Sequence, residues 1–344
     1  MTARVRRQSC SGAGSGLGPR GLRGGRLWQR ERPRQEPPAW LGPRGGNRRS
    51  FHPRASSVSP DCFVSCHRAG RYYVAPFVGD DAIFYQDGDA VIPTINAQGP
   101  WDAGAQHGGA VAGLLARAVE QEPTPVPMRV ARFTLDMLRR VPVKPLAIST
   151  EVLRTGKRIQ TVQAELHDGD ILVASAVAML VRTGAGFDMS PYRQPDVPLP
   201  PPPGSAEKPL AFNPRESMPE GFPHVVEFDR VVGSYRGGSP SKTWVRLLVP
   251  FVRGEETSPL VRLMALADFT SGLGAFLPYD QFVSINPDLT IHVLRYPTSE
   301  RICVDAETWV DADGIGQSKA RLFDENGLCA LSNASVFIET RARY

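Results

Sequence analysis

The sequence predicts an α+β fold made of two copies of one unit, each a long helix followed by antiparallel strands. Two observations support this prediction. A helix-like segment followed by several strand-like segments occurs twice, on either side of a proline-rich stretch. The two halves also align at an offset of 156 residues, as an internal repeat should. The aligned pairs include Thr134 with Thr290, Leu135 with Ile291, and Arg139 with Arg295.

Composition sets the domain boundaries. Residues 1–70 are rich in Arg, Gly, Pro and Ser without hydrophobic periodicity, so we expect them to be disordered. The first domain is then residues 71–186, and the second is residues 225–344. The segment between them, residues 187–224, is so rich in proline that it can form neither a helix nor a central strand, which predicts a semi-rigid linker.

The net charge of +5 belongs to the N-terminal extension. Residues 1–57 carry thirteen Arg against two acids, Glu31 and Glu36, which leaves the rest of the chain at −6. A folded part with this acidic balance does not fit a nucleic-acid-binding protein. Three interpretations of the extension stay open: a transit peptide, an arm that binds RNA or a membrane surface, and an extension without function.

Two further observations bear on the compartment. No apolar run approaches the roughly 20 residues that cross a bilayer, so we expect no membrane span. The five cysteines match neither a zinc spacing nor a disulfide framework. We therefore expect reduced thiols and a cytoplasmic location.

The first domain begins with a hairpin that turns at Gly88, followed by a loop at residues 99–104. Residues 110–120 have helical periodicity, which stops before Pro123. The rest of the domain is strand-like, with a second hairpin turn at Gly169. The strand-like segments are residues 132–141, 146–156, 158–170 and 171–182.

The second domain repeats this order. Two strand-like segments, residues 228–235 and 242–252, come before the helix. Ser258 followed by Pro is typical of an N-cap and a first helical turn, so we expect a helix from that point. Asp268 lies near the middle of this helix on an otherwise apolar run, and a short loop then leads to a strand that begins near Asn286.

Asp268 is the candidate catalytic residue. A buried carboxylate is costly unless it is paired, and its helical neighbours at i±3 and i±4 include no Lys or Arg. We therefore expect desolvation to raise its pKa, which suits a general base. The alternative is a structural aspartate that accepts hydrogen bonds from a neighbouring loop or faces water.

Four segments carry a resemblance to a known family. They are GPWDAGAQHGG at residues 99–109, LADFTSGLGAFLP at 266–278, INPDLTIHVLRYP at 285–297 and ENGLCALSNASVFIE at 325–339. Together they resemble the acyl-CoA thioesterase II-like group of the thioesterase-like superfamily, over roughly residues 75–344. This resemblance implies a double hotdog, in which two antiparallel sheets each wrap around a long central helix and are fused as a pseudo-dimer. The pantetheine arm of the substrate would lie between them.

The implied activity is hydrolysis of a fatty acyl-CoA to free acid and CoA, in fatty acid metabolism and without a cofactor or metal. The family's catalytic Asp aligns with Asp268, which would activate water as a general base. A helper Ser or Thr aligns with Asn286, which can still donate and accept hydrogen bonds. A helper Gln aligns with Ala334, which can do neither. Ser335 beside it is our third catalytic candidate, although strand alternation would turn it away if Ala334 points inward. Asn333 and Gln317 are the other candidates to hold the water.

Five more residues are candidate substrate contacts. Gly108 and Gly109 open a helix, where backbone N–H groups and the helix dipole could hold the oxyanion of a thioester. Equally, the glycines could only allow close packing, and His107 could only cap the helix. Thr270 and Ser271 follow Asp268 on its helix.

Two other functions stay open. The loss of the family's Gln at Ala334 favours an acyl-CoA binding module without activity. Asp288 and His292, at i and i+4 on a strand, resemble the pair of a hotdog enoyl-CoA hydratase, although their place on a strand favours a structural role. Because Ala112 aligns with Asp268, we expect one working site in each chain.

Cations and oligomerisation complete the expectations. Candidate cations for the phosphates of CoA are Arg139, Arg140, Lys157, Arg158 and Arg295. A homo-oligomer is possible, because hotdog sheets commonly pair further.

Overall fold

The computed structural model describes residues 81–342, apart from residues 89, 185, 193–194, 207–217, 234–239 and 279. The N-terminal extension expected at residues 1–70 lies outside the described residues. So do the first residues of the expected first domain and three of the five cysteines.

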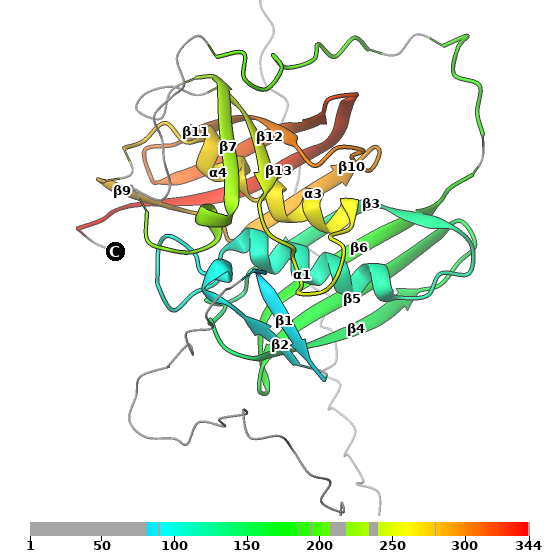
Figure 1. Ribbon diagram of the computed structural model, residues 1–344, viewed down its shortest axis with the longest axis horizontal. Helices are drawn as coiled ribbons and strands as arrows, with labels where there is room; N and C mark the ends of the chain where they lie inside the picture. Colours follow the sequence, from blue (N-terminus) through cyan, green and yellow to red (C-terminus); the bar gives the residue numbers. More distant parts are fainter. Residues whose placement is uncertain are drawn as a thin grey trace, which may run out of the picture. The chain divides into compact units, whose positions relative to one another are not determined.

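The first half has the predicted order of a hairpin, a helix and four strands (Figure 1). Gly88 and Gly169 adopt positive φ angles of 56° and 60° in the two hairpin turns, which confirms both turns. The elements are β1 (Phe84–Asp87), β2 (Ala90–Pro93), η1 (Ile95–Ala97), α1 (Gly108–Gln121), β3 (Met128–Asp136), β4 (Leu146–Arg154), β5 (Ile159–Asp168) and β6 (Ile171–Arg182).

The second half repeats this order after the linker, in whose described residues no helix or strand lies before η2. Its elements are η2 (Phe222–Val225), β7 (Val226–Val232), β8 (Ser241–Leu247), α3 (Pro259–Ala267), α4 (Phe269–Gly274), β9 (Phe282–Ile285), β10 (Asp288–Val293), β11 (Ile302–Val310), β12 (Ile315–Asp324) and β13 (Gly327–Thr340). The predicted N-cap is confirmed, because the Ser258 hydroxyl accepts a hydrogen bond from the Val261 amide at 3.1 Å.

The described strands form one continuous antiparallel sheet, where we expected two. Its order is β1-β2-β4-β5-β6-β3-β10-β13-β12-β11-β8-β7, and β9 pairs with β13. The halves join at β3 and β10, where Thr134 is paired directly with Thr290. These two residues are also equivalent in the repeat. An antiparallel pair centred on equivalent residues is locally two-fold symmetric, so the repeat in the sequence is centred on this pair of strands.

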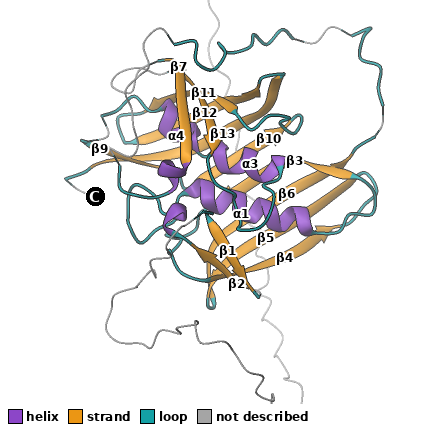
Figure 2. Ribbon diagram, in the orientation of Figure 1, coloured by secondary structure: helices purple, strands orange, loops and turns teal. Residues whose placement is uncertain are grey.

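The helices pack between the two halves of the sheet, with α1 against β4, β5 and β6 and with α4 against β8, β11 and β12 (Figure 2). Helices α1 and α3 pack on each other in opposite directions. Gly109 at the start of α1 lies against Ala265 at the end of α3, and Ser258 at the start of α3 bonds to Glu120 at the end of α1. We call these contacts the His107 end and the Ser258 end of the helix pair, after the two N-cap residues.

The helix predicted from Ser258 is interrupted at Asp268, where α3 ends and α4 begins. A side-chain hydrogen bond lies at this point. The Thr270 hydroxyl donates to the Ala267 carbonyl at 2.6 Å, which competes with the backbone ladder. The break places the Asp268 carboxylate at a junction rather than on a regular helical face.

The two described cysteines, Cys303 and Cys329, are free and buried. Burial raises the pKa of the Cys303 thiol to about 12 and that of Cys329 to about 11. Both therefore stay protonated and unreactive at neutral pH. None of the described helices is long and apolar enough to cross a membrane.

Candidate active site

Asp268 is buried, with 4% of its side chain exposed, and is surrounded by hydrogen-bond donors. Its Oδ1 accepts from Asn286 Nδ2 at 2.7 Å, and its Oδ2 lies 3.0 Å from His107 Nδ1. The Gly109 backbone amide is a third donor. The expectation of an unpaired carboxylate is therefore wrong, because the partners come from α1 and from a loop, which helical spacing does not include.

The proton of His107 Nδ1 determines how this cluster works. Nδ1 also lies 3.0 Å from the Gly109 amide nitrogen. One ring nitrogen cannot both accept from Gly109 and donate to Asp268, since it holds either a lone pair or a proton. A charged carboxylate is the stronger acceptor, so we assign the proton to Nδ1 and let both His107 and Gly109 donate to Asp268.

These donors determine the charge of Asp268. Burial raises the pKa of its carboxyl, but the hydrogen bonds and charge of His107, together with the bonds from Asn286 and Gly109, lower it below the ordinary value. The prediction of a raised pKa is therefore wrong. Asp268 is ionised at neutral pH. An ionised carboxylate has about four acceptor positions, so the three described donors leave about one of them unused.

Gly108 and Gly109 are needed for packing at this site. A Cβ on Gly108 would lie 2.7 Å from Asp268 Oδ1, and a Cβ on Gly109 would lie 2.3 Å from the Ala265 carbonyl oxygen. Because neither residue has a Cβ atom, the N-terminus of α1 can approach the carboxylate, where the helix dipole favours a negative charge. The Gly109 amide is engaged by the Asp268–His107 pair. An oxyanion role therefore stays a prediction for the Gly108 amide.

An aromatic cluster holds the His107 ring. Phe222 stacks on it with ring centroids 4.7 Å apart, and Phe269 lies 5.0 Å away on α4. The Phe222 amide donates to the Gln98 carbonyl at 2.8 Å, which fixes the end of the linker beside His107. Phe222 is not predictable from the sequence, because it follows a proline-rich stretch and carries no periodic signal.

Asn286 lies in the short connection between β9 and β10, two residues before β10 begins, which agrees with the strand expected to begin near it. Its Oδ1 accepts a hydrogen bond from the Ser271 hydroxyl at 3.1 Å. Ser271 is thus connected to Asp268 through the Asn286 amide. Ser271 is itself buried, with 6% of its surface exposed.

Thr270 and Ser335 do not join this cluster. The Thr270 hydroxyl lies 3.0 Å from Ser332 Oγ on β13, on the side of α4 that faces the sheet. Ser335 is exposed, and its backbone amide donates to Asp288 Oδ1 at 2.7 Å. Its neighbour Ala334 is buried, so strand alternation turns Ser335 outward and Asp268 gains no contact from it.

The remaining water-holding candidates follow the same alternation. Gln317 is exposed on β12, paired with Ser335, and Asn333 is two residues from Ser335 on the same face of β13. The hydratase pair is also apart from Asp268. Asp288 and His292 alternate along β10 with the fully buried Leu289 and Ile291, and His292 is exposed.

Two of the cations considered for CoA bind acidic residues of the protein. Arg140 Nη2 lies 2.6 Å from Asp102 Oδ1. Arg295 forms a bidentate pair with the buried Asp324, and this pairing lowers the pKa of Asp324. Arg295 therefore stabilises the hairpin between β12 and β13.

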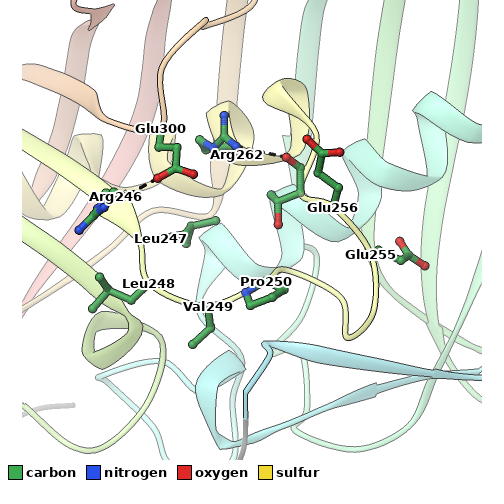
Figure 3. Close-up of a pocket in the computed structure, with 10 residues that line it drawn as sticks. Arg246, Leu247, Leu248, Val249, Pro250, Glu255, Glu256, Arg262 and Glu300 are labelled. Carbon is green, nitrogen blue, oxygen red and sulfur yellow. Dashed lines mark hydrogen bonds and ion pairs between the residues drawn. The ribbon is translucent and has the colours of Figure 1, made fainter.

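A pocket of about 410 Å³ lies beside the start of α3 (Figure 3). Its charged groups are largely used within the protein: Arg246 contacts Glu300, and Arg262 donates to the Thr257 carbonyl. The lining residues are Arg246, Leu247, Leu248, Val249, Pro250, Glu255, Glu256, Thr257, Arg262 and Glu300. Neither His107 nor Asp268 lines it, so this pocket is distinct from the cluster described above.

Comparison with solved structures shows what this fold resembles. A proposed thioesterase II from Thermobifida fusca matches with a TM-score of 0.59 and 18% identity, over 75% of this chain and 96% of that one. A hotdog-fold protein of unknown function from Alicyclobacillus acidocaldarius matches with a TM-score of 0.57 and 16% identity, over 76% and 97%. Acyl-CoA thioesterase II TesB2 from Mycobacterium marinum matches with a TM-score of 0.54 and 14% identity, over 76% and 95%. At sequence identities this low, the three matches support the hotdog fold and nothing about function.

The family is shown by the sequence models. No curated protein gives a significant sequence match. The model of the acyl-CoA thioesterase N-terminal domain matches residues 97–181, and that of the acyl-CoA thioesterase C-terminal domain matches residues 196–338. The two matches cover the helices and nearly all the strands described above, including His107, Asp268 and Asn286. The chain therefore belongs to the acyl-CoA thioesterase family and is a thioester hydrolase.

Proposed function

We propose that the protein hydrolyses a fatty acyl-CoA to free acid and CoA, with Asp268 as the general base for water. The observation that carries this proposal is the buried, ionised Asp268 carboxylate at the N-terminus of α1, which three donors hold with about one acceptor position left unused. A low pKa makes Asp268 a modest base. It also keeps the carboxylate ready to accept a proton throughout the neutral range.

The proposed reaction has two steps. Water bound at the free position of Asp268 attacks the thioester carbonyl while its proton passes to the carboxylate. The tetrahedral oxyanion is stabilised by the Gly108 amide and the positive end of α1. Collapse of the intermediate breaks the C–S bond and releases the CoA thiolate, which takes up the proton. Asn286 and His107 hold the carboxylate throughout.

We further propose that the two halves are fused hotdog domains packed as a pseudo-dimer, with domain limits at residues 71–186 and 225–344. The pantetheine arm then lies between the halves, next to the His107 end of the helix pair. The local two-fold relation of Thr134 and Thr290 supports this arrangement.

A second candidate function is acyl-CoA binding without turnover. Ala334 favours it, since a buried alanine stands where the resemblance implies a glutamine that holds water. In the hydrolysis we propose, the second N–H of the Asn286 amide takes over that role.

Thiol release from a panel of acyl-CoAs tests the proposal. We expect turnover by the wild type and a roughly 100-fold or greater loss of kcat in Asp268→Asn, which keeps the shape of the side chain but not its basicity. Binding of a non-hydrolysable acyl-CoA thioether, measured by calorimetry, should change little. If the wild type binds the thioether but releases no more thiol than Asp268→Asn, the binding module is the correct function.

A further inference from the structure

The Asn286 amide is held from both sides. Its Nδ2 donates to Asp268 Oδ1 at 2.7 Å, and its Oδ1 accepts from Ser271 Oγ at 3.1 Å. A primary amide has two N–H groups, and Asp268 uses one of them. The direction of the second N–H is then fixed by the plane of the amide. That plane is set by the two bonds together.

Asn286 needs such support because its backbone lies outside the strands. It is in the short connection between β9 and β10, next to Pro287. A bond to Asp268 alone fixes one atom and leaves the amide free to turn about that bond. The second contact, from Ser271, removes this freedom. The Asn286 amide is therefore oriented by α4 as well as by Asp268.

Ser271 itself lies on a firmly held element. The Ser241 hydroxyl of β8 donates to the Leu273 carbonyl, two residues after Ser271, at 2.6 Å. A Cβ on Gly274 would lie 2.8 Å from Thr308 Oγ1, so α4 sits close to β11. These contacts fix the position from which Ser271 reaches Asn286.

We infer that Ser271 is a positioning residue for thioester hydrolysis. Its hydroxyl sets the plane of the Asn286 amide, and this plane aims the second Nδ2–H of Asn286 at the attacking water or the thioester carbonyl. This inference rests on the proposed function. It changes the role expected for Ser271, from substrate contact to support of a water-holding amide. It also accounts for how an asparagine in a loop can serve where the resemblance implies a hydroxyl at the start of a strand.

A double-mutant cycle tests the inference. We expect Ser271→Ala to lower kcat roughly tenfold with KM within about twofold, because a misaimed donor weakens the transition state more than substrate binding. Asn286→Ala should lose at least as much. The double variant should lose no more than Asn286→Ala alone, since Ser271 acts only through the amide. Ser271→Thr, which retains the hydroxyl, should recover most of the activity.

Ser332→Ala is the matched control. It removes a buried hydroxyl that contacts α4 from the sheet side, and it leaves the Ser271–Asn286 bond in place. We expect a kcat close to wild type. Three results would overturn the inference: wild-type kcat in Ser271→Ala, equal losses in Ser271→Ala and Ser332→Ala, or losses at Ser271 and Asn286 that simply multiply.

A spectroscopic measurement separates this inference from the proposed function. The side-chain NH2 of Asn286 can be assigned in a ¹⁵N–¹H correlation spectrum by its disappearance in Asn286→Ala. In Ser271→Ala, the chemical shifts of the two Asn286 side-chain protons should become more alike. The protection of these protons from exchange with solvent should fall. An unchanged amide signal would overturn the inference. If the wild type releases no thiol but the amide signal responds, only the proposed function fails.

Discussion

At each end of the α1–α3 pair, the N-terminus of one helix meets a carboxylate from the other. At the His107 end, the start of α1 faces the buried Asp268. At the Ser258 end, the start of α3 faces Glu120, which accepts a hydrogen bond from the Ser258 hydroxyl. The backbone arrangement is thus similar at both ends. Any difference in chemistry between the two ends must therefore come from the residues placed there.

The first helical residues make one difference. Gly108 has a backbone N–H and leaves room for the carboxylate, whereas Pro259 has no N–H and fills the equivalent position at the other helix start. The carboxylates differ as well. Desolvation raises the pKa of Glu120, outweighing its bond from Ser258, whereas the three donors lower the pKa of Asp268. The His107 end therefore brings a helix-start N–H together with a carboxylate whose pKa is lowered, and the Ser258 end does not.

The largest effect in this comparison is expected from Gly108→Ala, which would make the His107 end as crowded as the Ser258 end. The new methyl would lie 2.7 Å from Asp268 Oδ1, so the carboxylate or the helix must move. We expect kcat/KM to fall roughly 100-fold and the free energy of unfolding to drop by about 1–3 kcal/mol. Thiol release and urea denaturation measure the two effects.

Gly272→Ala on α4 is the matched control. A Cβ there would meet nothing within 4 Å among the described residues. The substitution should leave activity unchanged and stabilise the helix by roughly 0.5–1 kcal/mol. A Gly108→Ala variant as active as Gly272→Ala would show that the close approach of α1 to Asp268 is not needed for turnover.

An intermediate effect is expected in the pH dependence of stability. Asp268 has a lowered pKa in the folded protein, so its stabilisation is present above its unfolded pKa and is lost as the pH falls through the folded value. Glu120 has a raised pKa, so it favours the folded state most below its unfolded pKa, and this contribution is lost as the pH rises through the folded value.

The two carboxylates should therefore give opposite trends. The Tm of the wild type relative to Asp268→Asn should decrease from pH 6 to pH 3. The difference in Tm between the wild type and Glu120→Gln should instead shift in favour of the wild type over the same range. Thermal melts at constant ionic strength measure both. Parallel trends would contradict the distinction between the two ends.

The smallest effect is expected at Arg117, near the Ser258 end. Its guanidinium forms a bidentate pair with Glu255, with distances of 2.7 and 2.6 Å, but the Glu255 side chain is 43% exposed. Solvent screening limits such a pair, so Arg117→Ala should cost about 0.5–1 kcal/mol of unfolding free energy and leave kcat unchanged. The cost should shrink at 1 M NaCl. A loss of turnover would show that the Ser258 end takes part in catalysis.

The sequence predicts the elements of this fold well, because each depends on local signals. Hydrophobic periodicity marks α1, glycines mark the hairpin turns, and Ser258 with Pro259 marks the start of α3. The repeat also identifies Thr134 and Thr290 as equivalent. It does not show that these residues pair, since joining two sheets into one depends on how the halves dock rather than on either half alone.

The site is less predictable for the same reason. Asp268 stands out in the sequence because a carboxylate interrupts an apolar run. Its partners do not, since His107 and Asn286 come from other elements and only folding brings them to it. Without them, desolvation alone gave the wrong direction for the pKa. Ser335 was a catalytic candidate only because it lies beside Ala334. Strand alternation, which is visible in the sequence, already indicated that its side chain points away from Asp268 if Ala334 points inward.

The junction at Thr134 and Thr290 has a consequence for how such a site can change over time. In a dimer of identical subunits, every substitution is made twice, so a change that relieves one end of a helix pair is imposed on the other end as well. Here the two equivalent strands belong to one chain. Each end can therefore vary independently. The Ser258 end can therefore carry Pro259 at its first helical position while the His107 end keeps Gly108. A substitution that serves only packing at one end leaves the residues of the other end unchanged.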